Sequence, residues 1–183
     1  DDNSHNGVTY TGFIVGSSDT IDNINLTGNV SYSYTYTRYG NVGSYEISID
    51  VADLKSTNYE FEAADGKLTV NKAKLTVTAN AHTITYGAAP TGNGVTYSGF
   101  VVGSSDNINN IGLSGEVTYS FNYSQFGNVG SNYTITPVVT GLSSTNYEFV
   151  GAAGKLTVSQ KVTSTDDGSI IFEPDITVNV VGE

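Results

Sequence analysis

Oxygen-bearing side chains gather in two short stretches of the same sequence, Gly16-Ser-Ser-Asp19 and Gly103-Ser-Ser-Asp106. Carboxylate and amide oxygens are the ligands that Ca²⁺ prefers, so Asp19, Asp22 and Asp106 are candidate calcium ligands. The EF-hand spacing is absent, however, and Asp22 is replaced by Asn109 in the second stretch. Ser or Asp before a short apolar turn is more typical of a helix N-cap. We therefore expect no resident cofactor, with calcium as the alternative.

Aromatic side chains that could stack on sugar rings form a second candidate site. They alternate with small polar residues over Val30–Thr37 and again over 117–124, which is typical of a strand with one buried face. Tyr39 becomes Phe126 in the second stretch, and loss of the hydroxyl without the ring is what a packed core tolerates. We expect core packing for most of these rings. The candidates for exposed ligand-binding aromatics are Tyr36, Tyr39, Tyr123 and Phe126.

Other reactive combinations are weaker. Lys67 and Lys155 recur with nearby Asn and Glu residues, the ingredients of an isopeptide bond. That bond needs a buried Lys, whereas each of these follows a Gly at the start of a predicted strand, where an exposed ammonium is expected. His5 and His82 lie at non-equivalent positions. Because no nucleophile motif or clustered acid–base pair accompanies them, we expect no enzymatic activity.

Composition limits the partners of the chain. Its 183 residues include 7 basic and 18 acidic ones, giving a net charge of −11. Such a charge repels phosphate backbones and anionic lipids, so we expect binding to neither nucleic acid nor membranes. There is no Cys, which excludes disulfides and thiolate metal sites. No stretch approaches the roughly 18 apolar residues of a membrane-spanning helix.

The elements that carry these residues occur twice. The sequence from Gly7 to Val70 returns from Gly94 to Val158, with Asn132 as the one inserted residue. Similarity over such a long period indicates an array of independently folding modules. We divide the chain into a first module over residues 1–71, a second over 72–159 and a tail over 160–183.

The predicted elements are strands separated by turns rich in Gly, Asn and Ser. Only residues 104–111 are compatible with a helix, of a single turn. We therefore expect two tandem immunoglobulin-like antiparallel β-sandwiches, with β-grasp modules as the alternative. Besides 30–37, the expected strands are Val8–Val15, Tyr45–Val51, Tyr59–Glu62, Lys67–Val70, Lys74–Ala79 and Thr83–Tyr86.

The two ends of the chain depart from the repeat. The second module opens with Lys72–Asn93, where the first has only Asp1–Asn6. We therefore expect the first module to lack its opening strand or strands, which leaves a sheet edge open to pairing. Ile176–Val181 in the tail could fill that place from a neighbouring molecule. Alternatively, the tail begins a third, truncated module.

The second module resembles a known family. The relevant residues are Lys74-Leu-Thr-Val-Thr-Ala79, Tyr86-Gly87-x-x-Pro90 and Gly154-Lys-Leu-Thr-Val158, which are similar to those of MBG modules of the YGX type. The first module is similar from Gly7 onwards but lacks the Tyr-Gly element. The resemblance implies tandem modules of large extracellular, adhesin-like bacterial proteins, which are secreted or anchored at the cell surface. It carries over no catalytic residue.

Two functions remain open at this stage. Only Asn71-Lys72-Ala73 joins the predicted strands of the two modules, and so short a connection favours a stiff stalk or spacer. The alternative is a module that itself binds host glycans or glycoproteins such as mucin, for which a repeated cluster of exposed aromatics would be the signature.

Overall fold

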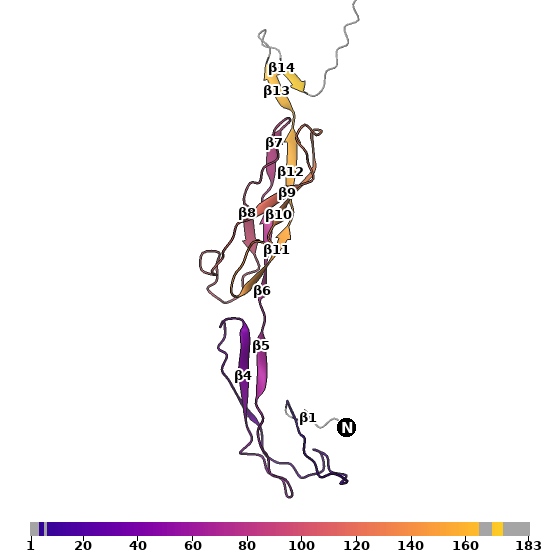
Figure 1. Ribbon diagram of the computed structural model, residues 1–183, viewed down its shortest axis with the longest axis vertical. Helices are drawn as coiled ribbons and strands as arrows, with labels where there is room; N and C mark the ends of the chain where they lie inside the picture. The colour runs from indigo at the N-terminus through magenta and orange to yellow at the C-terminus, as the bar shows by residue number, and fades with distance from the viewer. Residues whose placement is uncertain (1–3, 6, 165–169, 174–183) are drawn as a thin grey trace, which may run out of the picture. The chain divides into compact units, whose positions relative to one another are not determined.

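The computed structural model of the protein describes residues 4–5, 7–164 and 170–173. The chain divides into two compact units, Asp1–Asn71 (unit 1) and Lys72–Glu183 (unit 2), shown in Figure 1. The prediction of a mainly β chain is confirmed, and the described residues contain no helix. Over 104–111 the chain forms turns instead, because the Asn110 side chain accepts the Asn107 N–H and so satisfies the backbone locally. The β-grasp alternative therefore lacks its helix in the described residues.

Besides a two-stranded hairpin in the tail, the described residues of unit 2 form two sheets, and both are mixed. The first has the order β7 (His82–Thr85), β12 (Gly154–Ser159), β10 (Gly130–Val138), β9 (Thr118–Phe121). The second has the order β11 (Tyr147–Ala152), β6 (Ala73–Ala79), β8 (Val95–Ser98). The pairs β6–β11 and β7–β12 are parallel, so the expectation of purely antiparallel sheets is wrong. The reason is that the opening strands pair with the closing strands of the same unit, which run in the same direction.

This pairing fixes where the chain enters and leaves unit 2. Strand β7 follows β6 and strand β12 follows β11, each after a break of one or two residues. Since β6 runs parallel to β11 and β7 to β12, the two mixed sheets of unit 2 begin at the first residue of β6 and finish at the last residue of β12. These two points lie at opposite ends of the region formed by the two mixed sheets (Figure 1).

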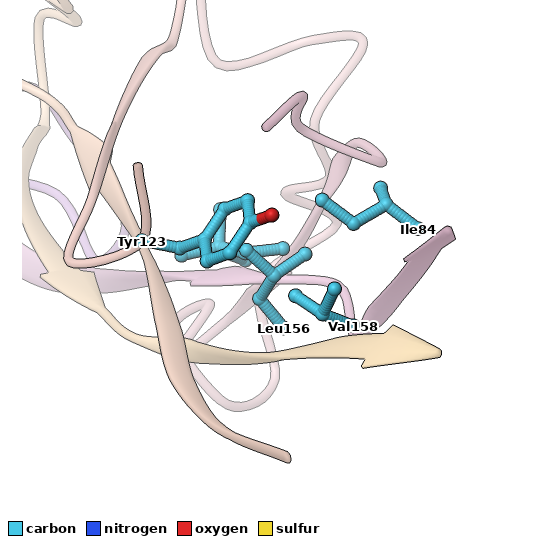
Figure 2. Close-up of a cluster of buried hydrophobic side chains, with 6 residues drawn as sticks. Ile84, Tyr123, Leu156 and Val158 are labelled. Atoms are coloured by element: carbon cyan, nitrogen blue, oxygen red, sulfur yellow. The ribbon is translucent and has the colours of Figure 1, made fainter. Parts of the chain in front are cut away.

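Apolar side chains of unit 2 form two buried clusters. One joins residues from β6, β7, β10 and β12 with the ring of Tyr123, and Figure 2 shows Tyr123 together with Ile84, Leu156 and Val158. The other surrounds Leu75 and Tyr147. Leu75 and Val77, on successive inward positions of β6, are both 0% exposed, so β6 supplies core to the whole unit. Full burial of such a side chain is worth about 1.5–3 kcal/mol.

Unit 1 repeats only part of this arrangement. Its strands are β1 (Ser4–His5), β2 (Val8–Thr9), β3 (Ser31–Tyr34), β4 (Gly43–Asp50) and β5 (Gly66–Val70). The sheet β3–β4–β5 reproduces β9–β10–β12: the pair Gly43–Val70 corresponds to Gly130–Val158 in unit 2.

Two predicted strands of unit 1 are wrong in extent. The strand expected over Val8–Val15 is confined to Val8–Thr9, and Tyr59–Glu62 is not a strand at all. Their counterparts in unit 2, β8 and β11, are both paired with β6. A strand needs a partner for its backbone groups, and the described residues of unit 1 offer none between these two segments beyond β1.

In the tail, β13 (Lys161–Ser164) and β14 (Ile170–Glu173) pair as an antiparallel hairpin. Ile176–Val181, the predicted donor strand, lies outside the described residues. Its two interpretations therefore stay predictions.

Candidate binding surfaces

The place of β6 in unit 1 is the first candidate site. In unit 2, β6 separates β8 from β11: Val77 lies opposite Tyr97, and Leu75 opposite Phe149. The counterparts of these two aromatics are Tyr10 and Phe61. In unit 1 their rings contact each other edge to face, with centroids 6.0 Å apart. In the described residues of unit 1, these two rings therefore contact each other directly, whereas β6 lies between their counterparts in unit 2.

The closure is incomplete. A cavity of about 80 Å³ remains between the flanks, lined by residues 10–13, Ile24 and residues 59–61. The Tyr10 hydroxyl is buried there without a hydrogen-bond partner, which costs about 1–3 kcal/mol. Burial, and to a lesser degree the neighbouring Tyr32, raises the pKa of Tyr10 above its ordinary value. The described residues of unit 1 therefore pack less completely around Tyr10 than unit 2 does around β6.

Burial of matched residues shows how far the defect extends. Ile135 and Leu156 are 0% exposed in unit 2, whereas their counterparts Ile47 and Leu68 are only half-buried. Tyr34 is 56% exposed, although its counterpart Phe121 packs against the core of unit 2. Strand β5 also pairs only with β4 on the described residues, while its counterpart β12 pairs with both β10 and β7. Among the described residues, unit 1 thus has more exposed apolar side chains than unit 2 at these matched positions, and β5 is paired along one edge.

The aromatic residues predicted to bind ligands fall into two groups. Tyr123 is 4% exposed and packs edge to face on Tyr133 at 4.9 Å, so the prediction that it is exposed is wrong. It is the last inward-facing residue of its stretch, and the turn after β9 folds its ring over the core. Its counterpart Tyr36 is half-buried and packs on Tyr45 in the same way, at 5.0 Å.

Tyr39 and Phe126 lie at equivalent turns and point outward. They are 42% and 67% exposed. Both have left-handed backbone conformations, with φ of 65° and 67°, which costs about 1 kcal/mol or more for a non-glycine residue. The Arg38 guanidinium lies 4.7 Å from the ring centre of Tyr39. The same strained turn therefore presents an aromatic ring in both units.

The candidate calcium residues Asp19 and Asp106 have a structural partner in each unit. The Tyr147 hydroxyl donates to Asp106 Oδ2 at 2.6 Å, and the Tyr59 hydroxyl to Asp19 Oδ2 at 2.5 Å. The Tyr147 oxygen also accepts the Val101 N–H at 3.2 Å. Asp22 is exposed, and no group of three potential metal-binding side chains occurs among the described residues. The geometry makes Asp19 and Asp106 anchors of their loops.

These loops expose an apolar pair that the sequence reasoning did not single out. Val15 is 100% exposed and its counterpart Val102 93% exposed, and the preceding residues, Ile14 and Val101, are also exposed. The signal in the sequence was the retention of two adjacent apolar residues directly before a glycine in both copies.

We expect the stability of unit 2 to fall above about pH 10. Burial, then the hydrogen bond to Asp106, raises the pKa of Tyr147 above its ordinary value of 10.0, and burial also raises the pKa of Tyr97. Between the unfolded and folded pKa values the unfolded chain loses the phenol proton first, so unfolding becomes more favourable. Below the unfolded pKa these groups contribute no pH dependence. Urea unfolding from pH 8 to 11 measures the effect, and Tyr147→Phe is expected to reduce its slope.

The remaining reactive side chains stay separate. Lys67 and Lys155 are exposed, in contrast to the buried Lys that an isopeptide bond needs. His82 Nε2 lies 3.3 Å from the Thr91 hydroxyl, and the side chain of His5 is outside the described residues. No helix in the described part of the chain is long and apolar enough to cross a membrane.

Comparison with known families agrees with the geometry of unit 2. Residues 75–157, from β6 to β12, match the family described as MBG domain (YGX type). The matched residues make up most of the second repeat. Searches of curated proteins and of solved structures returned no match. The matched region therefore extends over both mixed sheets of unit 2. Its Tyr86-Gly87 turn lies beside the exposed Phe126, because the Gln125 side chain donates to the Gly87 carbonyl at 2.8 Å.

Proposed function

We propose that the chain is a non-catalytic repeat segment of a bacterial cell-surface adhesin, acting outside the cell as a stiff spacer. The observation that carries the proposal is the path through the two mixed sheets of unit 2, which starts at β6 and finishes at β12, at opposite ends of this region. A module built in this way adds its length to whatever follows it. The connection between β5 and β6 has only two residues, Asn71 and Lys72, which favours limited motion between the units.

We assign each module to an immunoglobulin-like sandwich. In support, the Tyr133 hydroxyl donates to the Asn128 carbonyl at 2.9 Å and the Tyr45 hydroxyl to the Asn41 carbonyl at 2.6 Å. A tyrosine that bonds back to the backbone a few residues upstream is a feature of such sandwiches. Residues of β6 contact the core that β10 and β12 form, as expected for two packed sheets.

A force experiment tests the spacer function. Pulling the ends of unit 2 apart loads β6–β11 and β7–β12 along the strands, so that many hydrogen bonds must break together. Unit 1 has no such pairs in its described residues. In single-molecule stretching of the full chain we expect two unfolding events, with unit 2 at the higher force. Unfolding of both units at the same low force would contradict the proposal.

Direct binding of host glycans or glycoproteins is the second candidate function. It is favoured by the outward-facing aromatics at one strained turn, Tyr39 and Phe126. Strain of this kind is concentrated at functional sites.

A glycan and mucin array with the full chain separates the two functions. If the modules bind sugars, Phe126→Ala is expected to weaken binding about tenfold or more, since a desolvated aromatic anchor is worth about 2 kcal/mol. Val102→Ala, also exposed, is the matched control. Absence of binding by the folded chain, with and without Ca²⁺, would leave the spacer function alone.

A further inference from the structure

We propose that the turn of unit 1 that carries Arg38 and Tyr39 binds a sugar with an acidic group, either a carboxylate or a sulfate ester. Tyr39 packs on the sugar ring and Arg38 pairs with the acidic group. The equivalent turn of unit 2, with Gln125 and Phe126, has no such preference. The inference rests on the second candidate function, direct binding of glycans, and names the class of sugar at each turn.

Both turns have the same backbone. In unit 1 the Gly40 N–H donates to the Thr37 carbonyl at 2.9 Å. In unit 2 the Gly127 N–H donates to the Ser124 carbonyl at the same distance, 2.9 Å. The third residue of each turn is the exposed aromatic with the left-handed conformation. The closed turn therefore places an aromatic ring at the same position in both units.

A second ring lies directly beneath each turn. A side chain at Gly40 would come within 3.1 Å of the Tyr36 ring, and one at Gly127 within 2.8 Å of the Tyr123 ring. Each lower ring packs edge to face on a further tyrosine, which donates a hydrogen bond to a backbone carbonyl. The exposed ring thus stands on a packed base, and such preorganisation lowers the entropic cost of binding.

The residue before the exposed ring differs between the two turns. It is Arg38 in unit 1 and Gln125 in unit 2. The Gln125 amide is neutral and donates to the Gly87 carbonyl at 2.8 Å, so it is already held by the chain. The Arg38 guanidinium lies 4.7 Å from the ring centre of Tyr39. Unit 1 therefore presents a positive charge and an aromatic ring side by side.

An acidic sugar fits these two groups. The N–H groups at the edge of a guanidinium match the two oxygens of a carboxylate or sulfate. The apolar face of a sugar ring can pack on an aromatic ring, whose body is apolar. Arg38 is exposed, and 42% of the Tyr39 surface stays exposed with the guanidinium beside it. Both contacts are therefore accessible from solvent at one turn.

The charge of the whole chain favours a ligand with a single acidic group. Arg38 is the only arginine in the sequence, and the net charge is −11. Polyanions such as nucleic acids need several positive charges along their length. One acidic sugar needs only one, and other charges more than about 8 Å away are screened at physiological ionic strength. The turn is therefore suited to a glycan that ends in one acidic sugar.

Titration of the isotope-labelled full chain, followed by amide chemical shifts, tests the assignment. The probes are sialyllactose and its neutral methyl ester, and sulfated lactose and lactose itself. We expect each acidic probe to shift amides 37–40 and to bind there about fivefold more tightly than its neutral form, as for one well-formed exposed ion pair. Amides 124–127 are expected to respond equally to both members of each pair. Added NaCl should reduce the preference at 37–40.

Exchange of residues between the two turns supplies the matched controls. Arg38→Gln gives unit 1 the residue of unit 2 and is expected to remove the preference while keeping the binding of neutral sugars. Gln125→Arg is expected to create the preference at 124–127. Arg38→Lys keeps the charge without the flat fork and is expected to retain only part of it. Both positions are exposed, so we expect all three variants to fold.

The outcomes separate this inference from glycan binding in general. Equal binding of acidic and neutral forms at 37–40, or a preference that survives Arg38→Gln, would overturn the inference and leave glycan binding in place. Inorganic sulfate that binds as tightly as sulfated lactose would also overturn it, because the sugar ring would then contribute nothing. Absence of shifts at both turns of the folded chain would overturn both ideas and leave the spacer function unaffected. A response to only one acidic probe would support the inference and identify the acidic group.

Discussion

Replacing Ile135 with alanine is expected to lower the free energy of unfolding of unit 2 by about 2–5 kcal/mol, the usual cost of removing a fully buried isoleucine side chain. The same change at its counterpart, Ile47, is expected to cost less than about half as much. Ile135 is 0% exposed and lies in the closed core, whereas Ile47 is half-buried beside the open edge of β5. Water and neighbouring side chains can relax into the space left at Ile47 and reduce the cavity cost.

Hydrogen exchange monitored during urea unfolding of the full chain assigns each transition to its unit. The internal repeat supplies the control, because the two substitutions are chemically identical. Ile135 and Ile47 also lie opposite equivalent positions of their neighbouring strands. Equal losses of stability at both positions would mean that Ile47 lies in a closed core in solution.

Supplying unit 1 with an opening segment is expected to raise its stability by several kcal/mol. The change replaces Asp1–Asn6 with a copy of Lys72–Asn93, so that counterparts of β6 and β7 precede Gly7. The copied segment buries Leu75, Val77 and Ile84 in unit 2, and each such burial is worth about 1.5–3 kcal/mol before the cost of ordering the chain. Thermal unfolding should then show unit 1 approaching the transition of unit 2.

A control version of the grafted segment carries Asp at the positions copied from Leu75 and Val77. It has the same length and connection but cannot fill the core, so we expect no gain in stability. If both versions stabilise unit 1 equally, the effect would come from the added chain length and not from a completed sheet.

The sequence predicted the parts of the fold that depend on local pattern. Alternation of aromatic and small polar residues located β3 and β9, and the two Gly-Lys-Leu-Thr-Val stretches located β5 and β12. It could not predict that Tyr59–Glu62 is irregular while the nearly identical 147–150 is a strand, because the difference lies in the neighbouring β6, which is distant in sequence. Whether this segment forms a strand depends on the presence of a neighbouring strand to pair with. The strand preferences of its own residues do not indicate whether such a neighbour is present.

The candidate site residues were predictable to a similar extent. Exposure of Tyr39 and Phe126 agrees with the sequence prediction, but the burial of Tyr123 depends on a turn that folds its ring inward. Asp19 and Asp106 were recognised as retained carboxylates. Their tyrosine partners lie 40 or 41 residues away in the sequence, so no spacing rule could have indicated the hydrogen bond.

The parallel pairing of the first and last strands of unit 2 also sets the order in which the module can fold. Ala73 pairs with Tyr147, and Thr85 with Ser159, so a chain that leaves the ribosome or an export channel from its N-terminus must expose β6 and β7 until nearly all of the module has followed. Contacts between such distant residues slow folding. Throughout that interval β6 is an apolar strand without a partner. Unpaired strands of a neighbouring module that has not yet folded then compete with β8 and β11 to pair with β6.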